Sequence, residues 1–359
     1  MHVNKISLTL DSGILGLQKY GGISNYWNKL IESMVCNNEL TTHLLLPSKI
    51  VNADFDRSLF TEYNSTLEHI PQKINRYLGA DVNEDCDVFH SSYYRQPITK
   101  RSVYVVSVYD FTYENYSKGI RKFVHHNQKA RAIKNADEVI CISDSTRRDT
   151  LRLFPSLDPS SVHVVHLAVD HENFFPEQEK DVKFKNAILY VGQRVGYKRF
   201  DLAVGAVSNF PQYKLSIVGP GLNKDEIKLL DSLIPNGWEY VGEVSLEKLR
   251  LIYSSAFAFI YPSDYEGFGL PILEAMACGC PVLAANNSSL PEIGGDAALY
   301  SMDQCSKEYA KKLFLIESER DSLVQKGLKR AKDFTWEKTF RDTRSIYLKG
   351  LNKKRQNNA

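Results

Sequence analysis

The chain alternates short apolar segments with longer stretches in which apolar residues recur at helical spacing. In the first half, the apolar segments predict strands at residues 3 to 10, 43 to 47, 86 to 90, 103 to 108, 138 to 143 and 162 to 166. Apolar runs separated by helical stretches are typical of parallel sheets that are covered on both faces. The first half therefore predicts a doubly wound α/β unit.

The same alternation begins again after the polar stretch PEQEKDVKFKN. Predicted strands follow at residues 187 to 192, 213 to 218, 239 to 242, 256 to 261, 281 to 285 and 297 to 300. Because 359 residues allow two domains that each bury a core, we expect one Rossmann-like domain at 1–175 and a second at 176–335. Ligands of such sheets collect at the carboxyl ends of the strands, so we expect the functional site there, in a cleft between the domains.

The last stretch, FTWEKTFRDTRSIYLKGL, has a partial helical stripe of apolar residues. The stripe comprises Trp336, Phe340, Ile346, Tyr347 and Leu351. We expect residues 336–359 to form a helix that docks through this stripe, followed by a disordered tail, KKRQNNA.

Composition and charge narrow the class of protein. A charged fraction of 25% and a net charge of +2 give no sign of a nucleic-acid partner. No apolar run approaches the roughly 20 residues that span a bilayer, and the segment MHVNKISLTLDSG lacks a signal-peptide pattern, so we expect a cytoplasmic protein. The six cysteines lack a paired zinc spacing, and we expect free thiols.

The most informative stretch is SDYEGFGLPILEAMACGCPVLA, in which seven residues separate Glu266 from Glu274. The preceding run, AFAFIYP, predicts a buried strand. A helix is expected to begin near Leu270, with Pro271 in its first turn and Gly279 at its end. Because each Cα–Cβ bond tilts toward the helix N-terminus, the side chain of Glu274 leans back toward the loop that carries Glu266.

The start of this helix suits an anion. Its first amides lack acceptors within the helix, and the flexible backbone of Gly267, Phe268, Gly269 and Leu270 lets a ligand come close. A diphosphate fits this description. Since a carboxylate repels a phosphate, the two glutamates are expected to accept hydrogen bonds from sugar or ribose hydroxyls. For either glutamate alone, a solvated acid is the alternative interpretation.

Two further loops carry candidate binding residues. Arg194 and Lys198 follow the strand AILYVG, where cations would stabilise a departing diphosphate; a solvated loop is the alternative. Gly21 and Gly22 precede the helical stretch SNYWNKLIESM in the loop after the first strand. Either they let a phosphate or an acceptor approach the backbone, or they form a tight turn capped by Ser24.

Strand ends in the first half carry other candidates. Tyr109 and Asp110 follow the apolar strand VYVVSV, and Asp110 is a candidate to bind or orient sugar hydroxyls. His90 ends the run DVFH, where a strand-capping role is an equally good interpretation. The segment Asp85-Cys86-Asp87 has the form of a metal-binding DxD pattern, but it precedes a strand. Its carboxylates should therefore point away from the ligand-binding edge, and no metal is expected.

Residues 118 to 134, KGIRKFVHHNQKARAIK, contain six Lys or Arg and no acid. A basic amphipathic helix of this kind suits an anionic lipid surface. A solvated helix face is the competing interpretation, and the sequence pattern favours it because the segment lacks a clean apolar stripe.

The motifs resemble those of the family 4 retaining glycosyltransferases (glycosyl transferases group 1) of GT-B fold, which include bacterial polysaccharide mannosyltransferases. The hallmark of that family is a pair of glutamates separated by seven residues around a GFGLP-type loop. The segment ILYVGQRVGYK resembles its strand and phosphate-binding loop, and NADEVICISDSTRRD resembles its last N-domain strand region. The resemblance covers nearly the whole chain. It implies two Rossmann-like domains that face a central cleft, with a last helix that crosses back to the first domain.

The resemblance also implies an activity: transfer of a hexose from a UDP- or GDP-linked donor to a glycan hydroxyl, with retention at the anomeric carbon. No metal and no cofactor other than the donor are implied. In this scheme Glu274 holds the ribose and Glu266 engages the transferred sugar near the chemistry. The backbone of 267–270 contacts sugar and phosphate, while Arg194 and Lys198 stabilise the diphosphate.

In the first domain, the resemblance implies an acceptor site. The glycine loop of the family matches Gly21-Gly22, and the family often has His-Asp where this chain has Tyr109-Asp110, so Asp110 stays a catalytic candidate while an imidazole role is not implied. Many relatives act on lipid-linked glycans at the cytoplasmic membrane face, which implies envelope polysaccharide assembly, such as lipopolysaccharide O-antigen, and peripheral membrane contact. The alternatives are a sugar-nucleotide epimerase of related fold and a noncatalytic protein that binds nucleotide sugars or glycans.

Overall fold

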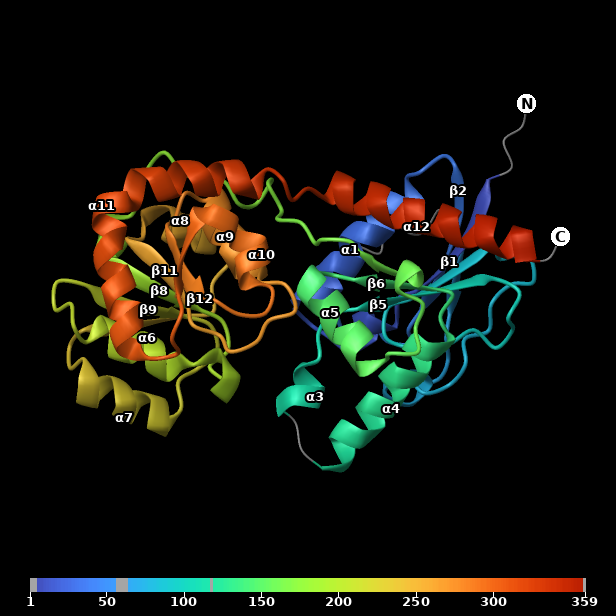
Figure 1. The fold of residues 1–359 in the computed structure, drawn as a ribbon, viewed down its shortest axis with the longest axis horizontal. Coiled ribbons are helices and arrows are strands. Elements are labelled where there is room, and N and C mark those ends of the chain that lie inside the picture. The colour runs from blue at the N-terminus through green and yellow to red at the C-terminus, as the bar shows by residue number, and fades with distance from the viewer. Residues whose placement is uncertain (1–4, 56–63, 117–118, 358–359) are drawn as a thin grey trace. The chain divides into compact units, whose positions relative to one another are not determined.

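The computed structural model describes residues 5–55, 64–116 and 119–357, and the chain divides into two compact units. The first unit comprises Met1–Leu167 together with Trp336–Ala359, and the second comprises Ala168–Thr335. Contacts thus assign residues 168–175, which the sequence pattern placed in the first domain, to the second unit. Figure 1 traces this order by colour, with the red C-terminal helix returning to the unit that holds the blue N-terminal strand.

The first unit is built on a seven-stranded parallel sheet with the order β3-β2-β1-β4-β5-β6-β7. Its strands are β1 (Ile6–Asp11), β2 (Leu40–Leu46), β3 (Ser65–Leu67), β4 (Val88–Ser91), β5 (Val103–Val108), β6 (Glu138–Cys141) and β7 (Val162–Val164). The order reverses at β1, so the switch point of this sheet lies between β1 and β4. The apolar pattern located these strands except β3, an exposed edge strand without an apolar run. Of the strand predicted at 3 to 10, residues 3 and 4 lie outside the described residues.

Helices cover this sheet. They are α1 (Gly22–Val35), α2 (Gln72–Asn75), α3 (Thr112–Tyr116), α4 (Ile120–Asn135), α5 (Asp144–Leu153) and α12 (Trp336–Asn357), with 3₁₀ turns at Gly13–Gly16 and Pro159–Ser161. Helix α1 packs against α12 and β2, and α12 also contacts β5 and β6. The C-terminal helix is therefore part of the core of the first unit.

The predicted docking stripe of α12 is buried at Ile346, Tyr347 and Leu351. The prediction of a disordered tail from residue 353 is wrong, because α12 continues to Asn357. The ammonium group of Lys354 donates hydrogen bonds to the carbonyl oxygens of Lys100 (2.9 Å) and Ser102 (2.7 Å). These bonds tie the last turns of the helix to the loop before β5.

The second unit repeats the architecture with a six-stranded parallel sheet in the order β10-β9-β8-β11-β12-β13. Its strands are β8 (Ala187–Val191), β9 (Lys214–Val218), β10 (Trp238–Gly242), β11 (Ala258–Tyr261), β12 (Val282–Ala285) and β13 (Ala298–Ser301). Its helices are α6 (Phe200–Val207), α7 (Lys224–Leu233), α8 (Leu246–Ser255), α9 (Leu270–Ala277), α10 (Leu290–Gly294) and α11 (Ser306–Ala331), with 3₁₀ turns at Val182–Phe184, Gly196–Lys198 and Gly295–Ala297. The switch point of this sheet lies between β8 and β11. Both units thus confirm the predicted doubly wound α/β class.

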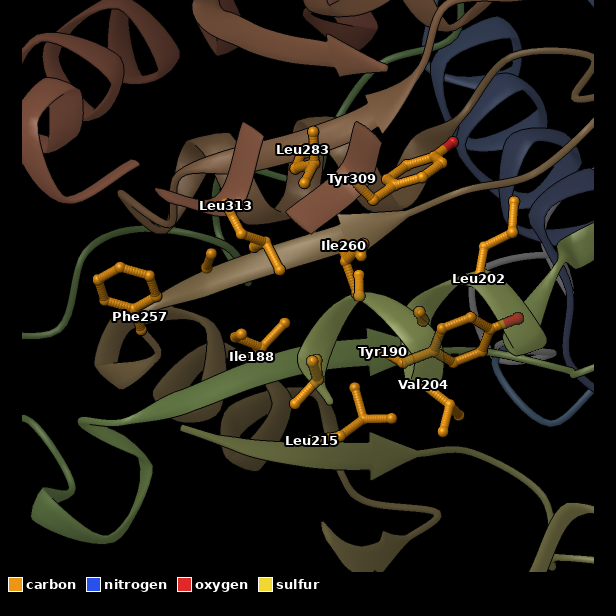
Figure 2. Packing of buried hydrophobic residues seen from close by; sticks show 14 of the residues in the cluster. Ile188, Tyr190, Leu202, Val204, Leu215, Phe257, Ile260, Leu283, Tyr309 and Leu313 are labelled. Atoms are coloured by element: carbon orange, nitrogen blue, oxygen red, sulfur yellow. The ribbon is translucent and has the colours of Figure 1, made fainter. Parts of the chain in front are cut away.

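The core of the second unit lies between the sheet and the helices α6 and α11, which pack against each other. Figure 2 shows Ile188, Leu215 and Ile260 on the strands beside Val204 of α6 and Leu313 of α11. All five side chains are buried. Because burying one such side chain contributes about 1.5–3 kcal/mol, this layer fixes the strands whose carboxyl ends carry the candidate site.

The cysteines, the DxD segment and the helix lengths bear on three expectations from the sequence. The six cysteines are free, with Cys36 and Cys305 exposed and Cys86, Cys141, Cys278 and Cys280 buried. In the DxD segment, the Asp87 carboxylate accepts a hydrogen bond from the backbone N–H of Ser7 (2.9 Å), at the amino ends of β1 and β4. Within the part of the chain that the structure describes, no helix combines the length and the apolar character needed to cross a bilayer.

Candidate functional site

The two loops at the switch point of the second sheet are joined to each other. The loop after β8 contains a 3₁₀ turn, Gly196–Lys198, and the loop after β11 carries Glu266. A backbone hydrogen bond of 2.7 Å runs from the N–H of Asp264 to the carbonyl oxygen of Tyr197. The two loops therefore form one structure at the edge where ligands of doubly wound sheets bind.

Lys198 and Glu266 form an ion pair at this edge. The Lys198 ammonium also donates a hydrogen bond to the Tyr261 hydroxyl (3.0 Å), and both charged side chains are largely buried, at 18% and 12% exposure. Burial raises the pKa of Tyr261 well above its usual value, and the neighbouring Glu266 carboxylate raises it further, so the hydroxyl keeps its proton. The sequence named both charged residues but did not predict that they pair.

Two serines hold the Glu266 loop. The Glu266 N–H donates to the Ser288 hydroxyl (3.0 Å), and the Ser289 hydroxyl lies 2.9 Å from the Glu266 carbonyl oxygen and 2.8 Å from that of Phe268. Sequence reasoning missed both serines. Both serines lie in the polar run NNSS between β12 and α10, a pattern that is typical of any loop and therefore did not single them out.

Helix α9 begins at Leu270 and ends at Ala277, close to the predicted bounds. Its N-cap is Gly269, at φ +104°, a left-handed conformation that favours glycine, and a Cβ there would lie 2.9 Å from Leu290. Glycine provides no capping side chain, Pro271 has no N–H, and the Ile272 N–H donates to the carbonyl oxygen of Gly269 (3.0 Å), so the Leu270 N–H is the amide of this first turn that faces outward from the helix start. The predicted helix start, with a glycine before its first turn, is therefore present in the fold.

Glu274 lies one turn into α9, in a different environment from Glu266. Its side chain is only partly exposed, and burial raises the pKa of its carboxyl group to about 7. The buried Tyr253 hydroxyl of α8 pulls this pKa back down, although it makes no hydrogen bond of good geometry in the described structure. Glu266 is paired with a lysine, whereas Glu274 lies beside the neutral hydroxyl group of Tyr253.

Arg194 is already engaged within the second unit. Its guanidinium lies 3.1 Å from the Glu226 carboxylate and donates to the carbonyl oxygen of Gly221 (2.8 Å). Only 3% of the side chain is exposed. Arg194 thus joins the loop after β8 to the loop after β9, a structural role that its sequence context did not predict.

Tyr109 and His90 lie inside the first unit. The Tyr109 hydroxyl accepts a hydrogen bond from the Trp27 indole N–H and donates to the carbonyl oxygen of Ser92 (2.9 Å). His90 is fully buried, with its ring nitrogens 2.6 Å from the Tyr347 hydroxyl and 2.9 Å from that of Ser107. Burial lowers the pKa of His90 to about 3, so the ring is neutral. Both side chains stabilise the core of the first unit.

Asp110 sits just beyond β5 and remains partly exposed. Its carboxylate accepts a hydrogen bond from the Thr112 N–H (3.1 Å), and burial raises its pKa while Lys129 opposes the rise. The Lys129 ammonium, itself buried, donates to the Asp110 carbonyl oxygen (2.8 Å) and pairs with Glu114 (2.9 Å). Sequence reasoning treated Lys129 as one charge of a basic segment and missed that it fixes the Asp110 loop.

Gly21 and Gly22 lie exposed at the start of α1, with Gly21 as the N-cap. The backbone of Gly21 is extended, at φ 163° and ψ 157°, a conformation that any residue adopts. The Ser24 hydroxyl donates to the Gly21 carbonyl oxygen (3.0 Å). The Gly21 carbonyl oxygen also accepts a hydrogen bond from the Asn25 N–H (3.0 Å), so it is engaged in the first turn of α1.

Two family models match the chain in succession. Residues 49–173 match "Glycosyltransferase Family 4", and residues 171–331 match "Glycosyl transferases group 1". Among curated relatives, the chain is 31% identical over 237 residues to an O-antigen chain mannosyltransferase B of Escherichia coli, covering 60% of this chain and 61% of that protein. It is 32% identical over 184 residues to an alpha-maltose-1-phosphate synthase of Mycolicibacterium smegmatis, covering 46% and 48%. The matches thus span about half to three fifths of these relatives' length.

Solved structures share the whole architecture. A sucrose-phosphate synthase from Thermosynechococcus elongatus has a TM-score of 0.74 at 18% identity and covers 96% of this chain and 99% of its own. Anabaena HepE in complex with UDP and glucose has a TM-score of 0.69 at 15% identity, covering 95% and 98%. At this level of identity the likeness concerns the fold.

Proposed function

We propose that this chain, which belongs to the glycosyltransferases of GT-B fold, transfers a hexose from a UDP- or GDP-linked donor to a glycan hydroxyl, with retention at the anomeric carbon. The observation that carries the proposal is the Lys198–Glu266 pair at the switch point of the second sheet, in the segment that leads to the uncapped start of α9. A cation, a hydroxyl acceptor and an outward-facing amide are the groups that a sugar diphosphate needs.

In this proposal, Lys198 stabilises the negative charge of the leaving diphosphate. The bond between the sugar C1 and the diphosphate oxygen breaks, and its electrons stay on that oxygen, where the ammonium group and the Leu270 N–H stabilise them. The acceptor oxygen forms the new bond on the same face of the sugar, and its proton passes to the leaving phosphate. No metal or further cofactor has a role in this scheme. Glu266 orients the sugar hydroxyls and holds Lys198 in place before the donor binds.

The nucleotide is assigned to the second unit and the acceptor to the first. Glu274 accepts hydrogen bonds from the ribose hydroxyls, the backbone of 267–270 contacts sugar and phosphate, and Arg194 adds positive charge while it stays paired with Glu226. In the first unit, the partly exposed Asp110 binds an acceptor hydroxyl, and Gly21 and Gly22 line the approach of the acceptor to the loop after β1. We assign Tyr109 no contact with the substrates, because its hydroxyl group already forms hydrogen bonds with Trp27 and Ser92.

The acceptor that we propose is a lipid-linked glycan in envelope polysaccharide assembly. The support is the O-antigen chain mannosyltransferases of Escherichia coli and Salmonella typhimurium among the relatives, the latter 26% identical over 196 residues. An acceptor of this kind places the enzyme beside the cytoplasmic face of the membrane.

A donor screen tests the proposal. Each UDP- or GDP-hexose is added to the protein and thermal unfolding is recorded, since a ligand that binds only the folded state raises the midpoint. The stabilising donor is then incubated with glycan acceptors, and release of nucleoside diphosphate, the anomeric configuration of the product and resistance to EDTA are measured.

Lys198→Ala should abolish most of the transfer. Lys248→Ala is the matched control, because Lys248 is another partly exposed lysine of the second unit that pairs with a carboxylate, Asp181. An isomerised nucleotide sugar without transfer would identify an epimerase instead. Absence of stabilisation by every donor would count against any nucleotide-sugar enzyme.

A further inference from the structure

Tyr261 is the last residue of β11, the strand next to β8 at the switch point of the second sheet, and the scheme above gives it no part. Its hydroxyl lies 3.0 Å from the Lys198 ammonium, which also stands 5.2 Å from the centre of the tyrosine ring. Only 4% of the residue is exposed. A buried tyrosine thus places a neutral hydroxyl beside the charged pair formed by Lys198 and Glu266.

Hydrogen bonding gives this hydroxyl a defined direction. An ammonium group donates protons and has no lone pair, so its bond to Tyr261 uses a lone pair of the oxygen and leaves the hydroxyl proton available. Burial, the charge of Glu266 and a hydrogen bond to its carboxylate raise the pKa of Tyr261, in that order. Tyr261 therefore accepts a hydrogen bond from Lys198 and donates one to Glu266.

Other buried tyrosine hydroxyls of the second unit have neutral partners. The Tyr190 hydroxyl lies 3.2 Å from the carbonyl oxygens of both Gln193 and Lys198. The Tyr309 hydroxyl meets the side-chain oxygen of Gln304 at 3.2 Å. Such bonds hold parts of the fold together. Tyr261 differs because a cation and a carboxylate share its hydroxyl, so its bonding changes whenever the two charges move apart.

The backbone around the pair is fixed, which leaves the movement to the side chain of Lys198. Its carbonyl oxygen is held by Tyr190, and its N–H donates to the carbonyl oxygen of Val195 (2.8 Å). Tyr261 is fixed by the pairing of β11 with β12 and by the ring of Phe259 at 5.4 Å. Because lysine carries its charge on a flexible four-carbon stem, the ammonium group can turn while the tyrosine ring stays in place.

Separation of this ion pair is costly. In the ligand-free protein Lys198 and Glu266 neutralise each other, and their side chains are only 18% and 12% exposed. When the ammonium group turns to a diphosphate, the carboxylate loses its cation in a place that water reaches poorly. A hydrogen-bond donor that stays on the carboxylate lowers this cost.

We propose that Tyr261 is a positioning residue for sugar transfer: its hydroxyl stays on the Glu266 carboxylate while the Lys198 ammonium turns to the diphosphate of the donor. The inference rests on the proposed function and adds a residue to it. Tyr261 touches neither the sugar nor the phosphate in this scheme. It acts through its two charged partners and keeps the carboxylate aimed at the sugar hydroxyls after the ion pair has opened.

The kinetics of Tyr261→Phe test this proposal in the full chain, with the stabilising donor and its glycan acceptor. The substitution keeps the ring and removes the hydroxyl. Negative charge on the diphosphate grows as its bond to the sugar breaks, so the ammonium group is drawn to it most strongly in the transition state. We therefore expect kcat to fall about 10- to 100-fold, the loss of one hydrogen bond to a charged group, while KM for the donor changes less than about threefold.

A double-mutant cycle separates positioning from a purely structural role. The glutamine in Glu266→Gln carries no charge, so Tyr261 has no carboxylate to hold in that variant. Adding Tyr261→Phe to Glu266→Gln should change the remaining rate by less than about twofold. An equal loss in both backgrounds would show that the hydroxyl acts independently of Glu266 and would overturn the proposal.

Tyr309→Phe is the matched control. Tyr309 is a fully buried tyrosine on α11 that also loses a hydroxyl hydrogen bond, outside the site, so kcat and KM should stay at their wild-type values. A Tyr261→Phe protein that does not fold, as judged by thermal unfolding, would assign the hydroxyl to the fold and overturn the proposal. Transfer by the wild type is measured first, because its absence would overturn the proposed function as well. An unchanged kcat in Tyr261→Phe would overturn the role of Tyr261 alone.

Discussion

Glu274→Gln is expected to stabilise the ligand-free protein above neutral pH. Burial raises the pKa of Glu274 from 4.5 to about 7. A carboxyl group whose pKa is higher in the folded state binds more protons there than in the unfolded chain, so stability falls as pH rises from about 4.5 to about 7. Above that range the full loss of stability caused by ionising the buried carboxyl group is present. Glutamine has the shape of the protonated acid and carries no charge, so it does not lose stability as the pH rises.

The size of the effect follows from the same shift. A change from 4.5 to about 7 corresponds to about 3 kcal/mol in the free energy of unfolding, as an upper value because part of the side chain reaches solvent. For a unit of this size, each kcal/mol moves the midpoint by about 2–4 °C. Glu274→Gln should therefore raise the midpoint of thermal unfolding by several degrees at pH 8 and leave it nearly unchanged at pH 4.

The assay is thermal unfolding of wild type and variant across this pH range without ligand. Glu319→Gln, an exposed change on α11, is the control and should leave the midpoint unchanged at every pH. A gain for Glu274→Gln that is the same at pH 4 and pH 8 would show that the ionised carboxylate is not the source of the cost. A loss at pH 8 would refute the reasoning outright.

Three further outcomes test other parts of the structure. Glu266→Gln should lower the rate of transfer by about 10²- to 10³-fold while donor-induced thermal stabilisation changes little, as measured by initial rates and thermal shift. Arg194→Ala should destabilise the second unit by about 1–3 kcal/mol in urea unfolding, because the largely buried Glu226 carboxylate and the Gly221 carbonyl oxygen lose their partner. Tyr347→Phe should cost about 1 kcal/mol in the same assay, since it removes the hydrogen bond to buried His90.

Strand positions could be predicted because both sheets are covered on both faces. Buried parallel strands such as β5 and β11 are nearly continuous apolar runs, which the sequence shows directly. Strand β3 was not predicted, because its three residues are exposed at the edge of the sheet, where burial imposes no apolar pattern. The tail of α12 was misjudged for the opposite reason. Its residues are polar, and its order comes from contacts of Lys354 with a loop distant in sequence.

In the candidate site too, features set by the local sequence could be predicted, whereas features set by tertiary contacts could not. Glu266, Glu274 and Gly269 could be named because a loop, a helix start and a strand follow each other within one short stretch. The partners that fix them could not be named, since Ser288 and Ser289 come from a loop that adjoins only in the fold. Sequence spacing reports which residues are near in the chain, and only tertiary packing decides which side chains meet.

The partners that sequence reasoning missed distinguish the surroundings of the two glutamates. Glu266 is held through its backbone by serines and through its carboxylate by Lys198, so its orientation does not depend on the sugar. Glu274 instead keeps an ionisable group in a partly buried place, where it forms no ion pair with the described residues, at a cost in stability that a neutral residue would avoid. A carboxylate kept at such a cost is what a group reserved for an external hydroxyl donor requires. Donor-induced stabilisation should therefore be smaller in Glu274→Gln, although that variant is the more stable protein without donor.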